Sequence, residues 1–171
     1  MSRPTIKLKL ILEDFEEGTF LEALTGCTEV GIEFRSMAML GDGAMNRRSL
    51  YELNKLCSKD IPGRGPFFEF EEFSQRRFGD HYDPHGVIIG LAGEQWVGLS
   101  ATSNWQERDF AFNEMTGVVR EYRRQGIATA LKLLGIRYAK SLGVSAIYTI
   151  HDFENNAAIE MNKLLGYVDA D

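Results

Sequence analysis

The sequence is poor in cysteine and proline, and it contains no long hydrophobic run. Its two cysteines, Cys27 and Cys57, form no CxxC motif, so free thiols in a reducing cytoplasm are favoured over a disulfide or a metal site. No apolar run approaches the roughly 20 residues that a membrane-spanning helix needs. Residues 1–15 interleave charged and apolar side chains where a signal peptide would have an unbroken apolar core. We therefore expect a cytoplasmic protein with no membrane partner.

Positive charge is also scarce. The chain has 19 Lys and Arg against 25 Asp and Glu, which gives a formal net charge of −6. Binding of nucleic acid depends on a basic surface that displaces counterions, so no nucleic-acid partner is expected. The acidic balance mildly favours a cationic partner such as an amine. A length of 171 residues is typical of one domain with a sizeable core.

The first half of the chain shows short periodic segments. Residues 5–12 alternate apolar and polar side chains, which predicts a strand, and residues 15–24 predict a short helix closed by Thr25 and Gly26. A strand over 30–40 and helices over 47–58 and 69–78 should follow. We expect residues 1–29 to be an N-terminal extension, a strand plus a short helix, that packs on a main domain of residues 30–171.

The second half is more strongly patterned. Strands are predicted over 86–93, 95–103, 111–119 and 146–150, helices over 126–142 and 155–165, and a last strand from Gly166. A helix joins the strand 111–119 to the strand 146–150, so these two strands should pair in parallel. The fold class expected is α/β, with a mixed, mostly antiparallel central sheet and helices on both faces.

One segment, residues 116–131, has the pattern of an anion site. A strand ends there in an arginine-rich turn and leads into a helix, whose first turn has unpaired N–H groups and the positive end of the helix dipole. Gly126 and Ala128 leave room for a phosphate to approach the backbone, and Arg123 and Arg124 add charge-assisted hydrogen bonds. The alternative is an ordinary solvated helix start with a few arginines.

The same segment resembles a known family. Arg123-x-x-Gly126-x-Ala128 is similar to the Q/R-x-x-G-x-G/A signature of GNAT acetyltransferases, and the helix from Asn155 to Leu165-Gly166-Tyr167 resembles the family's next element. The resemblance covers residues 86–168. It implies a GNAT-like sheet whose parallel fourth and fifth strands splay apart, acetyl-CoA as cosubstrate, and no metal.

The resemblance also implies which residues hold the cofactor. Val118 and Val119 would contact the pantetheine arm, and Asn155 would hydrogen-bond it, although Asn155 could equally be a simple helix cap. Asn162 lies two helical turns further along the same face, and its amide is expected to bind the cofactor too, by donating to the sulfur or to a pantetheine carbonyl. The pyrophosphate would lie on Arg123, Arg124, Gln125, Gly126, Ile127, Ala128 and Thr129.

Acetyl transfer to an amine needs a neutral nucleophile. An alkyl ammonium with a pKa near ~10.4 is almost wholly protonated at pH 7, and its deprotonation costs about 4–5 kcal/mol. Glu114 is our candidate general base, because it lies on the strand that leads to the motif and alternates in phase with Thr116 and Val118. The alternatives are that Glu114 is an exposed strand residue and that another group is the base: Asp109, Glu107 or His151.

The sequence departs from the family at the proton donor. The family places a tyrosine seven residues after the asparagine, where this chain has Asn162, which cannot act as an acid; Tyr148 or Tyr167 could replace it. The function expected is N-acetyl transfer from acetyl-CoA to a primary amine of a small molecule or protein. The alternative is a non-catalytic module that binds acetyl-CoA and regulates.

Three further features remain. The segment from His81 to His85 could suggest a metal site, but a solvated loop is favoured. Four phenylalanines, at 67, 68, 70 and 73, could form a core cluster or a pocket lid, and residues 47–78 should determine the acceptor. The family has one more strand after Leu-Gly-Tyr, so we expect residues 5–12 to pack on the C-terminal edge of the sheet, in their own chain or in a homodimer partner.

Overall fold

The computed structural model describes residues 2–170, which form a seven-stranded mixed sheet with helices on both faces. The strand order is β2-β3-β4-β5-β6-β1-β7, and every neighbouring pair is antiparallel except β5 and β6, which are parallel. The expected fold class and the expected parallel pair are thus confirmed. The strands are β1 (Thr5–Ile11), β2 (Ile32–Ser36), β3 (Val87–Ala92), β4 (Gln95–Trp105), β5 (Phe110–Val118), β6 (Ala146–Asp152) and β7 (Val168–Asp169).

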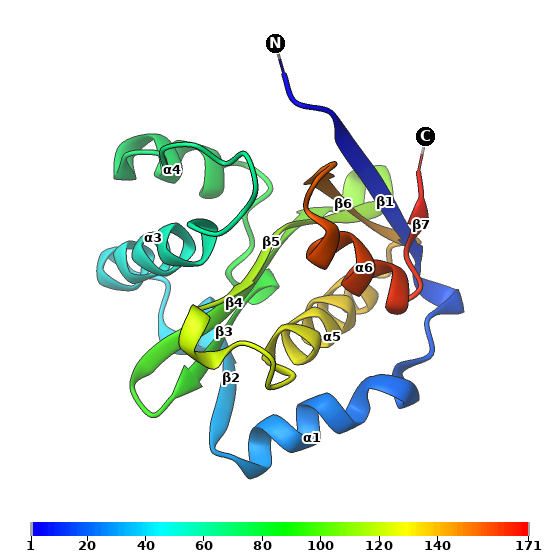
Figure 1. Ribbon diagram of the computed structural model, residues 1–171, viewed down its shortest axis with the longest axis horizontal. Helices are drawn as coiled ribbons and strands as arrows, with labels where there is room; N and C mark the ends of the chain where they lie inside the picture. Colours follow the sequence, from blue (N-terminus) through cyan, green and yellow to red (C-terminus); the bar gives the residue numbers. More distant parts are fainter. Residues whose placement is uncertain (1, 171) are drawn as a thin grey trace.

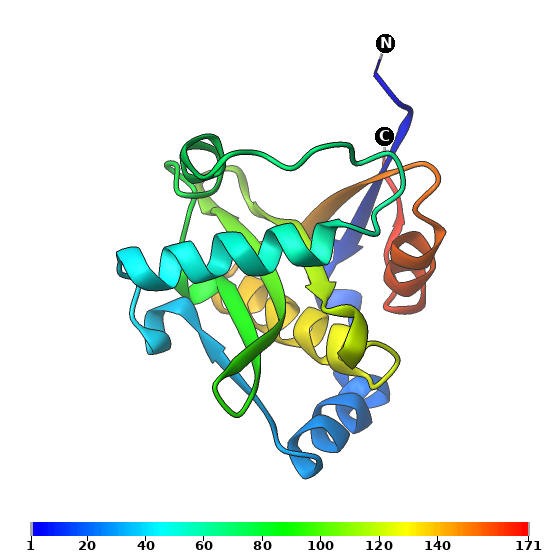
Figure 2. The same cartoon turned by 60° about the vertical axis from the view of Figure 1, so that its left-hand side comes forward.

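The longer helices lie on opposite sides of this sheet. In Figures 1 and 2, α3 and α4 cover one face, and α5 with α1 covers the other. The helices are α1 (Leu21–Glu29), α2 (Met37–Leu40), α3 (Ala44–Ser58), α4 (Phe70–Arg77), α5 (Ile127–Ser141) and α6 (Asn156–Leu164). None of the helices within residues 2–170 has the length and apolar character that crossing a bilayer requires.

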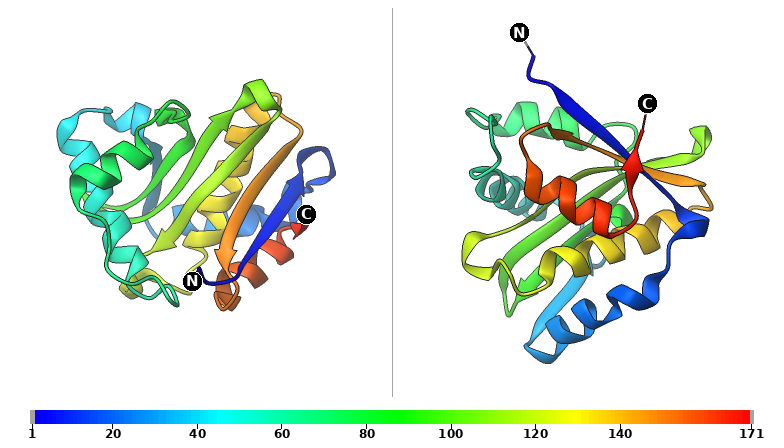
Figure 3. Two further views of the ribbon diagram at one scale, coloured as in Figure 1. Left: turned by 90° about the horizontal axis from the view of Figure 1, so that it is seen from above. Right: turned by 45° about the vertical axis from the view of Figure 1, so that its right-hand side comes forward.

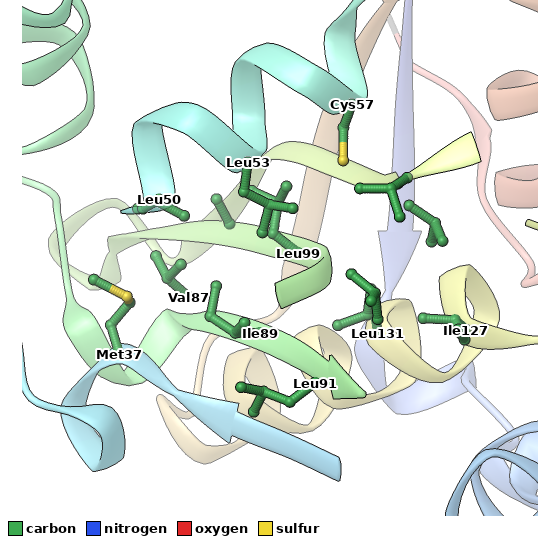
Figure 4. Packing of buried hydrophobic residues seen from close by; sticks show 14 of the residues in the cluster. Met37, Leu50, Leu53, Cys57, Val87, Ile89, Leu91, Leu99, Ile127 and Leu131 are labelled. Atoms are coloured by element: carbon green, nitrogen blue, oxygen red, sulfur yellow. The ribbon is translucent and has the colours of Figure 1, made fainter. Parts of the chain in front are cut away.

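The apolar side chains form two buried clusters. The larger one fills the space between α3, the sheet and the start of α5, and includes Leu50, Leu99 and Leu131 (Figure 4). The second lies between β1, the end of α5 and the residues that follow α6, and includes Leu8, Leu133 and Leu165. The two clusters anchor the halves of the sheet on either side of the β5–β6 junction.

Two N-terminal predictions were wrong in detail. The helix predicted over 15–24 is instead one short 3-10 segment, Glu17–Phe20, followed by α1, which continues past Gly26 to Glu29. The strand predicted over 30–40 ends at Ser36, whose hydroxyl accepts a hydrogen bond from the amide of Met39 and caps α2. A serine N-cap competes locally with strand pairing, and the apolar pattern alone did not show it.

The N-terminal strand completes the C-terminal side of the sheet. β1 pairs antiparallel with β6 over seven positions and with β7 over two, so it lies between them. Leu8 and Leu10 point into the second apolar cluster and are buried. The expected packing of residues 5–12 against the C-terminal edge is confirmed, within the same chain.

Candidate functional site

The site begins where β5 and β6 separate. These strands pair only over Phe110–Phe112 and Ala146–Tyr148, and beyond these positions they diverge (Figure 3). A cleft of about 610 Å³ opens at this divergence. Its walls are β5 from Glu114 to Val118, the end of β6, the start of α6, the first turn of α5 and the loop that follows α3.

A β-bulge lies at the inner end of this cleft. Ala101 pairs with Met115, but Thr102 pairs with Asn113, so Glu114 is the extra residue on β5. The expectation that Glu114 is in phase with Thr116 and Val118 was therefore wrong. Thr116 donates to Asn113 on the α5 side of the sheet, whereas Glu114 turns to the α4 side. Bulges re-aim side chains in this way, and sequence alternation does not reveal them.

The Glu114 carboxylate is held by two donors and lines the cleft. Ser103 donates to its Oε1 over 3.0 Å, and Nη1 of Arg77 lies 3.2 Å from its Oε2. Arg77, on α4, also donates to the amide oxygen of Asn54 on α3. The surrounding protein lowers the pKa of Arg77 mainly by burial. These contacts orient the carboxylate toward the side of the cleft that α3 and α4 cover.

The arginine-rich turn has the backbone of an anion site. Gly126 caps α5 with a φ of +84°, a left-handed conformation in which glycine is favoured, and Arg124 has a φ of +63°. Within residues 2–170, the amides from position 124 to position 129 donate to no protein acceptor. Six N–H groups at a helix N-terminus are therefore free to bind a negative group.

The side chains of this turn differ in whether they line the cleft. Arg123 and Ala128 line the cleft, and Arg124 and Gln125 are exposed beside it. The side chain of Ile127 is buried in the core, so only its backbone amide is available. Val118 lines the cleft, but Val119 is buried and its amide donates to Val97, so the structure does not bring Val119 to the cleft.

An aspartate forms ion pairs with two arginines of this turn, Arg120 and Arg123. Asp60, in the loop after α3, lies 2.6 Å from Nη2 of Arg120 and 2.7 Å from Nη1 of Arg123. These hydrogen bonds lower the pKa of the Asp60 carboxyl. Nε of Arg123 also donates to the carbonyl oxygen of Val118. An anionic ligand that binds these arginines would therefore have to compete with the Asp60 carboxylate.

The two asparagines of the last helix behave differently. Asn155 lines the cleft and caps α6 by accepting from the amide of Ala158, so both of its expected roles remain open. Asn162 is fully buried, and the structure does not place it on the cleft surface. Its Nδ2 lies 2.7 Å from Nε2 of His151, which does line the cleft.

The other proton-transfer candidates lie elsewhere. Asp109 accepts from the amide and hydroxyl of Ser145, and Glu107 lies 3.4 Å from Nδ1 of His81, both at the opposite end of β5. Tyr148 packs against Phe110 away from the cleft, and burial raises the pKa of Tyr167. Within the described part of the chain, no three metal-ligating side chains lie together.

A buried polar network below the cleft was not predicted from the sequence. Lys132 of α5 is buried and donates to Asn113 over 3.1 Å, and desolvation lowers its pKa to about 7. Thr149 of β6 donates to the carbonyl oxygen of the same Asn113. Lys132 lies five residues after Ile127, about 140° around α5 and off its predicted apolar stripe, so the helical periodicity did not signal its burial.

The chain is similar to known proteins in sequence and in fold. The family model described as acetyltransferase (GNAT) family matches residues 47–167. A mycothiol acetyltransferase from Thermobispora bispora is 26% identical over 120 residues, which cover 67% of this chain and 40% of the relative. One from Nocardiopsis dassonvillei is 25% identical, with 67% and 37% covered. The chain thus spans about 40% of the length of the curated relatives it matches.

Solved structures share the fold. The ribosomal-protein-S18-alanine N-acetyltransferase from Escherichia coli superposes with a TM-score of 0.64 at 18% identity, covering 82% of this chain and 79% of that one. A GCN5-related N-acetyltransferase from Sphaerobacter thermophilus gives a TM-score of 0.66 at 18% identity, with 98% and 49% covered. At these identities the likeness establishes the architecture alone.

Proposed function

This chain belongs to the GNAT family of acetyltransferases, and we propose on that premise that it transfers an acetyl group from acetyl-CoA to a primary amine of a small molecule or a protein. The observation that supports this best is the cleft at the β5–β6 divergence, which joins a free helix N-terminus to a carboxylate on the bulge. We further propose that the protein acts in the cytoplasm.

The residues at the mouth of the cleft fit a pyrophosphate. The unpaired amides of residues 124–129 can donate to phosphate oxygens, and the left-handed Gly126 directs the chain into α5 behind them. Arg123 can add a charge-assisted hydrogen bond once it releases Asp60. Arg124, Gln125 and Thr129 complete this proposed binding turn.

The walls of the cleft fit an extended amide-bearing arm. Beyond Phe112, the edge of β5 that faces the cleft has no neighbouring strand within residues 2–170. The carbonyl oxygens of Asn113 and Val118 already accept from Thr149 and Arg123, so the backbone groups between them can pair with ligand amides. Asn155, at the start of α6, offers a side-chain amide from the other wall. Acetyl-CoA supplies the activated acyl thioester; the protein supplies this extended binding edge.

Glu114 is the proposed general base. Its carboxylate faces the α3–α4 side of the cleft, where an acceptor amine can approach the end of the arm. Ser103 and Arg77 fix the carboxylate in place, and each oxygen keeps a lone pair for the ammonium proton. Removal of that proton, directly or through a water, produces the neutral nucleophile that attack on a thioester needs.

The acceptor is the least determined part of this proposal. The sequence relatives named above are mycothiol acetyltransferases, and one of the structural neighbours is a ribosomal-protein-S18-alanine N-acetyltransferase. The acceptors of these proteins differ. In this chain the acceptor wall comes from residues 47–78, where Tyr51 packs against Phe67, Phe70 and Phe73. Phe68 and Arg64 line the cleft itself. We infer that these residues select the amine.

Turnover separates this function from the non-catalytic alternative. Calorimetry with acetyl-CoA measures binding, and release of free thiol in the presence of a panel of primary amines measures transfer. Amine-dependent thiol release supports the enzyme. Tight binding of acetyl-CoA without release, for any amine of a chemically broad panel, supports a regulatory module instead.

A further inference from the structure

A histidine and an asparagine form an isolated pair on the β6–α6 wall of the cleft. Nδ2 of Asn162 lies 2.7 Å from Nε2 of His151, and Oγ1 of Thr149 lies 3.5 Å from the same nitrogen. Asn162 is fully buried, whereas His151 is half-buried and lines the cleft. The proposed acetyl transfer assigns no role to either side chain.

This arrangement defines which ring nitrogen of His151 carries the proton. The Thr149 hydroxyl donates to Asn113, and its 3.5 Å contact with Nε2 is much longer than the 2.7 Å contact of Asn162. With the asparagine Nδ2 as donor, Nε2 accepts and the neutral imidazole carries its proton on Nδ1. Within residues 2–170, Nδ1 has no protein partner, yet it is not among the side-chain atoms sealed from solvent. His151 therefore presents a free Nδ1–H donor to the cleft.

The imidazole is also kept neutral. Burial and the nearby Lys132 lower the pKa of His151 to about 4. Thr149 on the same strand and Tyr167 after α6, whose ring lies 4.9 Å from Nζ of Lys132, also lie near this pair. The carboxylate of the adjacent Asp152 also lines the cleft, but it is paired with Arg3. At neutral pH, His151 is thus a hydrogen-bond donor and not an acid.

His151 lies at about the same depth in the cleft as Glu114, the proposed base. The last β5–β6 pair joins Phe112 to Tyr148, so Glu114 lies two residues beyond it on one wall and His151 three residues beyond it on the other. At a rise of about 3.3 Å per residue, the two lie within one residue of the same depth. A thioester at this depth therefore lies between Glu114 on one wall of the cleft and His151 on the other.

The side chains of Glu114 and His151 also lie on opposite faces of the sheet. Glu114 contacts Arg77 of α4, and His151 contacts Asn162 of α6 and lies near Lys132 of α5. An amine that approaches from the α4 side leaves the departing sulfur on the α5–α6 side. A neutral N–H donor at that position can hydrogen-bond the sulfur as negative charge develops on it.

We propose that His151, held in its Nδ1–H form by Asn162, donates a hydrogen bond to the sulfur of the leaving CoA thiolate, and that Asn162 is a positioning residue that acts through His151. In this step the carbon–sulfur bond breaks and its electron pair goes to sulfur. His151 stabilises that charge without giving up its proton, and the thiolate takes a proton from water. The proposal rests on the acetyl transfer proposed above.

The buried amide of Asn162 is consistent with a positioning role. Its Oδ1 is buried with no partner among the described residues, and such an unpaired acceptor destabilises the folded state. Turning the amide around would bring Oδ1 to the histidine and leave two donors unpaired instead. Asn162→Leu removes both polar groups at similar volume, so it should leave stability near that of the wild type while releasing Nε2.

The tautomer can be measured without any substrate. The chain has three histidines, so ¹⁵N-labelled imidazole resonances can be assigned by comparison with His81→Gln, His85→Gln and His151→Asn proteins. We expect His151 to carry its proton on Nδ1 in the wild type and to become a mixture of tautomers in Asn162→Leu. An Nε2–H form in the wild type would overturn the proposal, whatever reaction the protein performs.

Isosteric variants then test the donor in catalysis. An asparagine at 151 places its Nδ2 near the position of Nδ1, a glutamine places its amide near that of Nε2, and a phenylalanine places no donor. We expect His151→Asn to stay within a few-fold of wild-type kcat, and His151→Gln and His151→Phe to lose about tenfold or more with smaller changes in acetyl-CoA affinity. His85→Gln, at an exposed position, is the matched control.

Failure of the two proposals can be told apart. If the wild type transfers acetyl groups and His151→Phe matches it in kcat, the role of His151 is wrong and the enzyme assignment stands. If the wild type binds acetyl-CoA but transfers nothing to any amine, the proposed function fails, and the hydrogen bond to a leaving thiolate fails with it.

Discussion

Asp60 and Arg123 form an ion pair of 2.7 Å across the mouth of the cleft, and the same carboxylate lies 2.6 Å from Arg120. The pair links the loop after α3 to the turn before α5. Arg120 and Arg123 therefore share the single negative charge of one carboxylate of the same molecule. A pyrophosphate that binds Arg123 has to displace this carboxylate, so Asp60 acts as an internal competitor.

The first prediction follows from that competition. Asp60→Asn removes the negative charge and leaves a side chain of the same size, so acetyl-CoA should bind a few-fold more tightly. Exposed ion pairs contribute about 0–1 kcal/mol, which limits the size of the effect. Titration calorimetry measures it, with the exposed Asp80→Asn as control. A weaker affinity would mean that Asp60 organises the binding turn instead of competing with the ligand.

Ala128 offers a direct test of the phosphate site. It lies in the first turn of α5 and lines the cleft, and a glutamate in the first turn of a helix is compatible with the helix dipole. Ala128→Glu should therefore fold normally but weaken acetyl-CoA binding by about a hundredfold through charge repulsion. Ala128→Ser is the control. Equal affinities for the two variants would exclude this turn as the phosphate site.

Gly126 is a poorer position for such a test. Its φ of +84° strains any other residue, although an added Cβ would make only an ordinary van der Waals contact with Ala23 of α1, at 3.7 Å. A loss of binding in a Gly126 variant would therefore not distinguish a blocked phosphate site from a distorted turn.

The proposed base predicts a change in rate with little change in cofactor binding. Glu114→Gln keeps an acceptor oxygen for Arg77, and its amide nitrogen can donate to the Ser103 hydroxyl in a reversed contact. It cannot take a proton, so kcat should fall about 10²–10³-fold at neutral pH. The rate should recover as the pH approaches the pKa of the amine. Steady-state kinetics from pH 6 to 10 check this, with Glu107→Gln as control. Wild-type rates across that range would assign proton removal to water.

Lys132 predicts a dependence of stability on pH. Its pKa is lowered from 10.5 to about 7 by burial, so between these values the unfolded chain binds a proton that the folded protein does not. The free energy of unfolding should therefore rise with pH, by up to about 1.4 kcal/mol per unit, across that window. Below pH 7 this contribution should be constant.

Lys132→Met isolates this contribution. Urea denaturation at pH 7 and pH 9 should show the wild type gaining about 2–3 kcal/mol relative to Lys132→Met. The exposed Lys55→Met is a control for loss of a surface lysine on another helix. A constant difference between the wild type and Lys132→Met over this range would mean that Lys132 stays charged inside the protein.

The sequence predicted the fold better than the site, for identifiable reasons. Turns at Gly93 and Gly126 and the apolar stripe of α5 are local signals, so the order of elements from β3 to α6 could be predicted. The place of β1 between β6 and β7 depends on partners about 140 residues away, and only the family resemblance suggested it.

Within the site, backbone features were readable and side-chain directions were not. The motif from Arg123 to Ala128 predicted a helix N-terminus at a strand end, which the structure shows. The bulge at Glu114 reversed its expected face, and the buried position of Asn162 depends on how α6 packs beside β6. Register shifts and helix rotation are tertiary effects that a single sequence does not encode locally.

The most direct test of the account is a stoichiometric one. Purified protein is mixed with acetyl-CoA and a primary amine, and free CoA thiol and N-acetylated amine are quantified in the same samples over time. The account predicts that the two products appear in equal amounts, that both depend on the amine, and that both are strongly reduced in Glu114→Gln at neutral pH. Thiol release without acetylated amine, for every amine tested, would contradict it.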